Sequence, residues 1–196
     1  MTDRPIIFSA PMVQALIEGR KTQTRRILKK GCPASRNLIL PDGPNKGAVQ
    51  LNYAPGNRLW VKETHARYPE GDLCLPHYMA DGPIPSISDR HDAGLLIKYP
   101  AIFMPRWASR LTLAVTDVRV QRLQDITEDD AQAEGLVQAY EGWATDTQGR
   151  CWGPTARDSF VQLFDSLHGT HAWGKNPWVV ALTFDVHRGN IDEVQP

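Results

Sequence analysis

The chain has 196 residues, and its shares of hydrophobic residues (41%) and charged residues (22%) are those of a globular protein with a core of its own. Its 22 acidic residues balance its 22 basic residues, so no net field draws the protein onto nucleic acid or a membrane. Its apolar runs, such as Trp178 to Leu182, are far shorter than the roughly twenty residues that span a bilayer.

The start of the sequence and the cysteines predict a cytoplasmic protein without a membrane partner. The first residues lack the basic start and apolar core of a signal peptide. Cys32, Cys74 and Cys151 are scattered and form no Cys-x-x-Cys pair, which indicates reduced thiols and argues against structural zinc. No P-loop, dinucleotide-binding or nucleophile-elbow motif is present, so we expect no cofactor. The oligomeric state is left open.

A short helix is predicted within residues 8–18. Ser9 suits the N-cap, and Pro11 suits the first turn, where no amide donor is missed. Gly19 follows at the position where a left-handed C-cap is favoured. The basic stretch that comes next is therefore attached directly to the end of a helix.

The basic stretch, residues 20–26, carries Lys21 and Thr24. A threonine hydroxyl is a weak nucleophile that needs a base beside it, and a lysine can be that base if neighbouring cations and burial lower its pKa. Arg20, Arg25 and Arg26 are such cations. The spacing of three brings Lys21 and Thr24 to one face only if the backbone turns between them, whereas a straight strand would separate them. From this stretch alone, a solvated basic loop is the favoured interpretation.

Residues 58–64 alternate as a strand, between turn-rich stretches on both sides. Glu63 at its end is a carboxylate that could face a pocket or form a salt bridge with an arginine. The next strong strand is predicted over residues 110–123, preceded by Arg106 and Trp107. A guanidinium beside an indole can hold a phosphate and stack a base, although Trp107 could equally be a core residue.

Two capped helices and a closing strand follow. Residues 127–134 form the first helix, which is opened by a threonine cap and ends at a glycine with Glu134 in its last turn. Glu134 could orient a lysine or relay a proton, but a solvated glutamate is the ordinary alternative. The second helix is predicted over residues 155–167 and the strand over residues 178–186. His168 and His171 lack a third partner, which argues against a metal site.

Strands in runs, interrupted by a few short helices, predict an α+β domain built on a small antiparallel sheet or barrel. The alternation of strands and helices that a doubly wound fold requires is absent. Strong strand signals lie on both sides of each loop-rich stretch, so we expect one domain over residues 1–196.

Several sequence motifs, taken together and in order, resemble those of the ASCH domains, which are small relatives of the PUA fold. The resemblance is to the ASCH domains carried by phages and prophages in particular. The resemblance rests on ordered motifs: Gly19-Arg20-Lys21-Thr22-x-Thr24-x-Arg26, Gly56-x-x-Leu59-x-Val61, Ile126-Thr127-Glu128-x-x-Ala131-x-x-Glu134, Met104 to Arg110, and Trp178-Val179-Val180. Asn57 stands where the family usually has aspartate. The resemblance implies a PUA-like small β-barrel with flanking short helices, and insertions at about residues 31–55, 66–100 and 136–154.

One branch of this family is an amidohydrolase that removes the acetyl group from N4-acetylcytidine. The resemblance implies that Lys21, Thr24 and Glu134 are the catalytic residues, acting on a modified nucleoside or nucleobase without a metal ion. Arg26 and backbone amides after Gly19 are candidates to stabilise the oxyanion. The candidates for binding the substrate are Arg25, Arg26, Trp60, Glu63, Arg106 and Trp107. The alternative is a non-catalytic module that binds RNA, single-stranded DNA or a modified base.

Overall fold

The computed structural model describes residues 3–28, 37–38, 49–67, 76–83, 97–146 and 150–194. The chain forms two compact units. The first unit comprises Met1–Glu18, Arg58–Ala114 and Val186–Pro196, and the second comprises Gly19–Asn57 and Val115–Asp185. Strands β9 (Leu111–Arg122) and β12 (Trp178–Arg188) contribute residues to both units.

The first unit contains the predicted helix, which is confirmed as α1 (Ala10–Ile17). Ser9 is its N-cap residue, a proline stands in its first turn, and Gly19 after it has a φ of 76°, which favours glycine. The other elements of this unit are β1 (Asp3–Ile7), β5 (Arg58–Lys62), β6 (His65–Arg67), β7 (His77–Tyr78), β8 (Ile97–Tyr99), and the 3₁₀ turns η1 (Met79–Asp81), η2 (Ala101–Phe103) and η3 (Arg106–Ala108).

The strands of the first unit form two sheets. β1 pairs in parallel with β5, and β5 pairs antiparallel with the start of β9. β6 lies between β7 and β8 in a small antiparallel sheet. The predicted strands at residues 58–64 and 110–123 are confirmed in β5 and β9.

The second unit contains both of the later helices at their predicted positions. Thr127 caps α2 (Glu128–Ala133) and Thr155 caps α3 (Ala156–His168), each through its side-chain oxygen. The strands of this unit, besides its parts of β9 and β12, are β2 (Gln23–Ile27), β3 (Asn37–Leu38), β4 (Val49–Gln50), β10 (Val137–Ala139) and β11 (Gly142–Ala144), and its 3₁₀ turns are η4 (Leu123–Asp125) and η5 (Trp173–Lys175).

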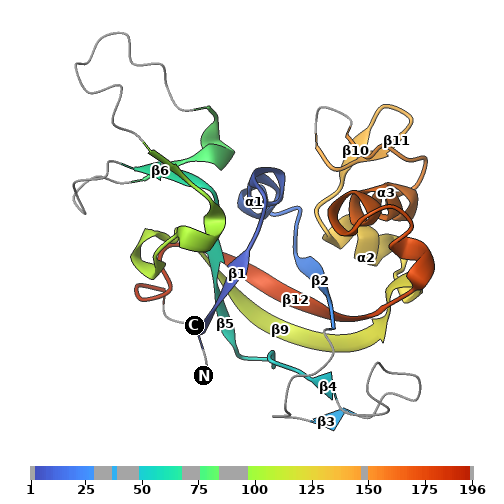
Figure 1. The fold of residues 1–196 in the computed structure, drawn as a ribbon, viewed down its shortest axis with the longest axis horizontal. Helices are drawn as coiled ribbons and strands as arrows, with labels where there is room; N and C mark the ends of the chain where they lie inside the picture. The colour runs from blue at the N-terminus through green and yellow to red at the C-terminus, as the bar shows by residue number, and fades with distance from the viewer. Residues whose placement is uncertain are drawn as a thin grey trace. The chain divides into compact units, whose positions relative to one another are not determined.

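A hydrophobic core holds α2 and α3 together in the second unit, where the two helices lie side by side (Figure 1). Phe160 and Phe164 of α3 are buried with their ring centroids 6.0 Å apart. The core also includes Leu123, Ile126, Ala131, Leu136, Ala156, Ala172 and Val179. Because α2 is anchored here, the residues at its end have a fixed position from which to meet β2.

The predicted α+β class is confirmed, since the described residues combine sheets with three α-helices. Within the described residues, neither unit's strands close into a barrel. The single domain and its insertions stay predictions, and much of the stretches 31–55 and 66–100 lies outside the described residues. None of the helices in the described part of the chain has the length and apolar character needed to cross a membrane.

Candidate active site

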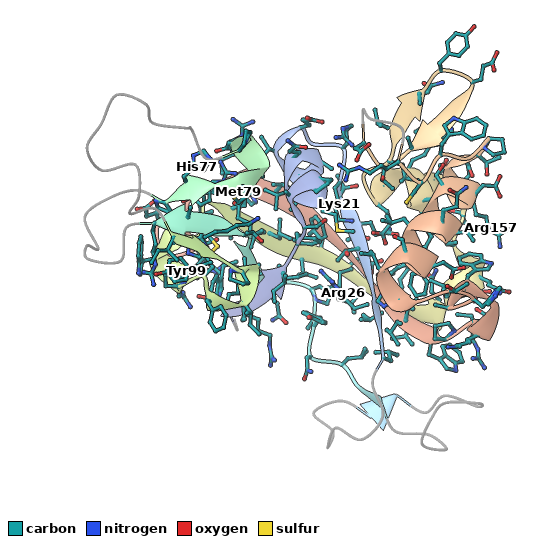
Figure 2. All side chains as sticks on the ribbon, turned by 45° about the horizontal axis from the view of Figure 1, so that its top comes forward. Lys21, Arg26, His77, Met79, Tyr99 and Arg157 are labelled. Carbon is teal, nitrogen blue, oxygen red and sulfur yellow. The ribbon has the colours of Figure 1, made fainter. Side chains whose placement is uncertain are left out.

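The basic stretch after Gly19 is a strand, so its interpretation as a solvated loop is wrong. Residues from Gln23 onward form β2, which pairs antiparallel with β12 and places Thr24 opposite Leu182. Gln23, Thr24 and Arg25 are all buried. Figure 2 labels Lys21 and Arg26 at the two ends of this stretch.

The residues just before β2 bind the C-terminal end of α2. The backbone amide of Thr22 donates to the Ala133 carbonyl (2.9 Å), and Arg20 donates to the Gly135 carbonyl (2.5 Å). Lys21 and Glu134 also form an isolated antiparallel bridge. The last carbonyls of a helix have no partner within the helix and carry partial negative charge, so a basic segment is well suited to this position.

Lys21 is completely buried, and its ammonium meets three acceptors. Nζ donates to Glu134 Oε2 (2.8 Å), to the Glu134 carbonyl (2.8 Å) and to the Gln23 carbonyl (2.9 Å). Glu134, at the C-cap of α2, is 6% exposed, so its interpretation as a solvated surface glutamate is wrong. The structure thus brings together two of the three predicted catalytic residues.

Arg25 joins the same cluster from β2. Its guanidinium forms ion pairs with Glu134 Oε1 (3.1 Å) and Asp130 Oδ2 (2.7 Å), and both carboxylates belong to the α2 segment. Arg119 reaches the other oxygen of Asp130 (2.9 Å). Burial alone would raise the pKa of Asp130, but the hydrogen bond from Arg119 and the charge of Arg25 lower it, so this carboxylate is ionised at neutral pH.

Burial lowers the pKa of Lys21, because removing an ammonium from water disfavours its charged form. The Glu134 carboxylate opposes this effect, whereas the charges of Arg26 and Arg25 add to it. The amine of Lys21 is therefore neutral at lower pH than an ordinary lysine, which a base in acyl transfer requires.

Thr24 and Arg26 share one face of β2, because side chains alternate along a strand. The charge of Arg26 affects the pKa values of Lys21 and of His168, so its guanidinium lies within electrostatic range of both. Within the described part of the chain, the hydroxyl of Thr24 takes part in no recorded hydrogen bond, and none joins it to Lys21.

Trp60 and Glu63 belong to the first unit. Trp60 is 9% exposed in β5, and the ammonium of Lys62 lies 5.3 Å from the centroid of its ring. Glu63 is buried and receives two hydrogen bonds from Arg110, of 2.8 and 3.0 Å. Burial raises the pKa of Glu63 although Arg110 opposes it. The salt-bridge alternative for Glu63 is confirmed.

Arg106 and Trp107 also lie in the first unit, in η3. Arg106 forms ion pairs with Asp3 (2.7 Å) and Asp192 (2.6 Å). Trp107 is 45% exposed, so its interpretation as a core residue is wrong. The guanidinium of Arg106 is thus already paired with carboxylates, while the indole of Trp107 is available at the surface.

Metal ligands are not gathered in the part of the chain that the structure describes. No three histidine, cysteine, aspartate or glutamate side chains come together there in a way that could hold an ion. His168 and His171 are both exposed. Cys32 and Cys74 lie outside the described residues, and Cys151 is a free cysteine.

Sequence reasoning missed three members of the cluster: Gln23, Asp130 and Arg119. The side chain of Gln23 accepts from Arg25 (2.5 Å) and donates to Asp130 (3.1 Å). A signal for Asp130 existed, because Asp130 and Glu134 are four residues apart and therefore face one side of a helix. No local pattern pointed to Gln23.

Comparisons of the chain with protein-family models, with curated proteins and with solved structures find no match. A buried lysine of lowered pKa contacts a carboxylate, on a stretch that also carries a hydroxyl and a guanidinium. These are types of group that can move a proton or stabilise a negative charge, and Lys21 and Glu134 are the two that are in direct contact.

Proposed function

We propose that this protein is an amidohydrolase that removes the acyl group from an N4-acylated cytosine nucleoside or a related modified base, without a metal ion. The observation that carries this proposal is the buried 2.8 Å contact between Lys21 Nζ and Glu134 Oε2 beside the strand that bears Thr24. The resemblance to ASCH domains, and with it a PUA-like barrel, is part of the same proposal and rests on the sequence landmarks.

In the proposed reaction, the hydroxyl oxygen of Thr24 attacks the acyl carbonyl carbon while the neutral amine of Lys21 takes the hydroxyl proton. A neutral amine has two hydrogens for the three acceptors around it, so one of these contacts is given up when the lone pair turns to the Thr24 hydroxyl and receives its proton. Arg26 stabilises the oxyanion, an electrostatic role that is typically worth about a hundredfold or more in rate.

Collapse of the tetrahedral intermediate breaks the bond between the acyl carbon and N4. The proton held by Lys21, which Glu134 orients, passes to N4, and the free amino base leaves. Water then attacks the ester on Thr24, with Lys21 again as the base, which releases the carboxylic acid and restores the hydroxyl. A nucleophile, a base and an orienting carboxylate thus act as one unit.

The proposal predicts turnover of N4-acetylcytidine by the purified protein in the presence of a chelator, with cytidine measured by chromatography. The rate should rise with pH through the lowered pKa of Lys21, because the base must be neutral to act. A panel of other N4-acylated cytosine nucleosides identifies the preferred acyl group, and an enzyme-free incubation corrects for spontaneous hydrolysis.

The proposal would be contradicted if the protein deacylated none of the nucleosides in that panel. The same protein preparation also tests the alternative function, a nucleic-acid-binding module. A nucleic-acid-binding module would bind RNA or single-stranded DNA with an affinity that falls steeply with salt, and would leave acylated nucleosides intact. The ion pairs of Arg106 with Asp3 and Asp192 weigh against that alternative, because they occupy a guanidinium that it requires.

A further inference from the structure

The guanidinium of Arg25 bridges the two carboxylates of the α2 segment. Its Nη2 lies 2.7 Å from Asp130 Oδ2, and its Nη1 lies 3.1 Å from Glu134 Oε1. The side chain of Arg25 is 1% exposed, and those of Asp130 and Glu134 are 12% and 4% exposed, so solvent screens these ion pairs only weakly. A planar guanidinium can bind two acceptors in fixed directions, which an ammonium cannot do.

The two oxygens of Glu134 have different partners. Oε1 accepts from Arg25, and Oε2 accepts from Lys21 at 2.8 Å. Because Arg25 binds Oε1, the carboxylate is held in the orientation that presents Oε2 to the ammonium. The other two N–H groups of Lys21 donate to the Glu134 and Gln23 carbonyls.

The other end of the bridge is held in turn. Asp130 Oδ1 accepts from Gln23 (3.1 Å) and from Arg119 (2.9 Å), which leaves Oδ2 for Arg25. The side-chain oxygen of Gln23 also accepts from Arg25 Nη1. In addition, Arg25 Cζ lies 6.0 Å from the centroid of the Phe160 ring. Asp130, Gln23 and the core thus fix the orientation of the guanidinium.

We propose that Arg25, anchored by Asp130, is a positioning residue that holds Glu134 in the orientation in which a single carboxylate oxygen serves Lys21. This inference rests on the proposed function for its kinetic consequence. Its structural consequence, the protonation state of Lys21, can be measured whether or not the protein is an amidohydrolase.

Two effects of Arg25 on Lys21 have the same sign. Removing Arg25 leaves the charge of the Glu134 carboxylate to Lys21 without a competing cation, and it also removes a nearby positive charge. Both changes favour the charged form of Lys21 and so raise its pKa. The charged groups that act on Lys21 are Glu134, Arg26 and Arg25, while Asp130 and Arg119 lie behind Arg25, and His168 lies near Arg26.

The test is an NMR titration of Lys21 in protein with ¹³C-labelled lysine side chains, with the resonance assigned by its loss in Lys21→Met. Arg25→Gln should raise the pKa of Lys21 by about one unit or more, which reduces the neutral fraction about tenfold at neutral pH. The rising limb of the pH–rate profile should move to higher pH by the same amount, with a lower kcat at neutral pH and little change in KM.

Arg25→Lys is the second variant, because an ammonium keeps the charge but cannot bridge both carboxylates. It should move the Lys21 titration in the same direction by a smaller amount, and it decides the question if Arg25→Gln does not fold. Arg150→Gln, at a surface ion pair with Asp146 in the same unit, is the matched control and should leave the titration unchanged.

A folded Arg25→Gln protein with a lower melting temperature but the wild-type Lys21 titration would overturn the inference, since Arg25 would then be merely structural. If the wild-type protein shows no deacylation but the Lys21 titration moves as described, the positioning role holds and the proposed function fails. The two proposals are therefore separable.

Discussion

Glu134→Gln is expected to lower the free energy of unfolding of the second unit by about 3 kcal/mol, because it leaves two buried cations without their shared carboxylate. Lys21 is completely buried and Arg25 nearly so, and both form ion pairs with Glu134. The amide has the shape of the carboxylate, so the loss reports the charge and not a cavity. Urea unfolding followed by tryptophan fluorescence measures it.

The pairing of the charges is tested by adding Lys21→Met to Glu134→Gln. The double variant should regain much of the lost stability, because the unpaired cation has been replaced by an apolar side chain of similar size. Asp185→Asn, at an exposed carboxylate of β12, is the control and should change the stability by less than about 0.5 kcal/mol. Equal losses from Glu134→Gln and Asp185→Asn would refute the buried ion pair.

Thr24→Val is expected to reduce kcat by about a thousandfold or more, because it removes the oxygen that forms the acyl bond. Thr24 is 4% exposed, and the described structure records no hydrogen bond to its hydroxyl. Valine has nearly the same shape and also favours strands, so folding and substrate binding should be preserved. Steady-state kinetics and a thermal melt of the same preparation measure these quantities.

Thr24→Ser is the matched variant, since it keeps the hydroxyl and loses only a methyl group, and it should retain part of the activity. If the role of Thr24 were structural, Thr24→Val would lower the melting temperature and weaken binding and turnover together. A Thr24→Val protein with an unchanged melting temperature and full activity would eliminate Thr24 as the nucleophile.

The elements that local signals specify were predicted well from the sequence. The N-caps at Thr127 and Thr155 and the glycines after α2 and α3 define both helices, because capping depends on neighbouring residues alone. Gly135 and Gly169 both adopt a φ of 98°, outside the range of most other residues. Lys21 and Glu134 were predicted as site residues because a lysine can act as a base and a glutamate can orient it, and because of the family resemblance.

The arrangement around Lys21 could not be predicted, because it depends on contacts between distant parts of the chain. β2 forms by pairing with β12, and Lys21 meets Glu134 across 113 positions in sequence. The position of Gln23 between Arg25 and Asp130 follows from that pairing. A basic run read in isolation has no such partners, so a solvated loop was the natural but wrong interpretation.

The central claim, that Lys21 and its carboxylate partner form a catalytic centre, is tested most directly by the initial rate of N4-acetylcytidine deacylation in Lys21→Met and wild-type protein. Both preparations should contain chelator and have matched circular dichroism spectra. The wild type should release cytidine steadily, and Lys21→Met should release none above the enzyme-free rate. Equal rates in the two proteins would contradict the central claim.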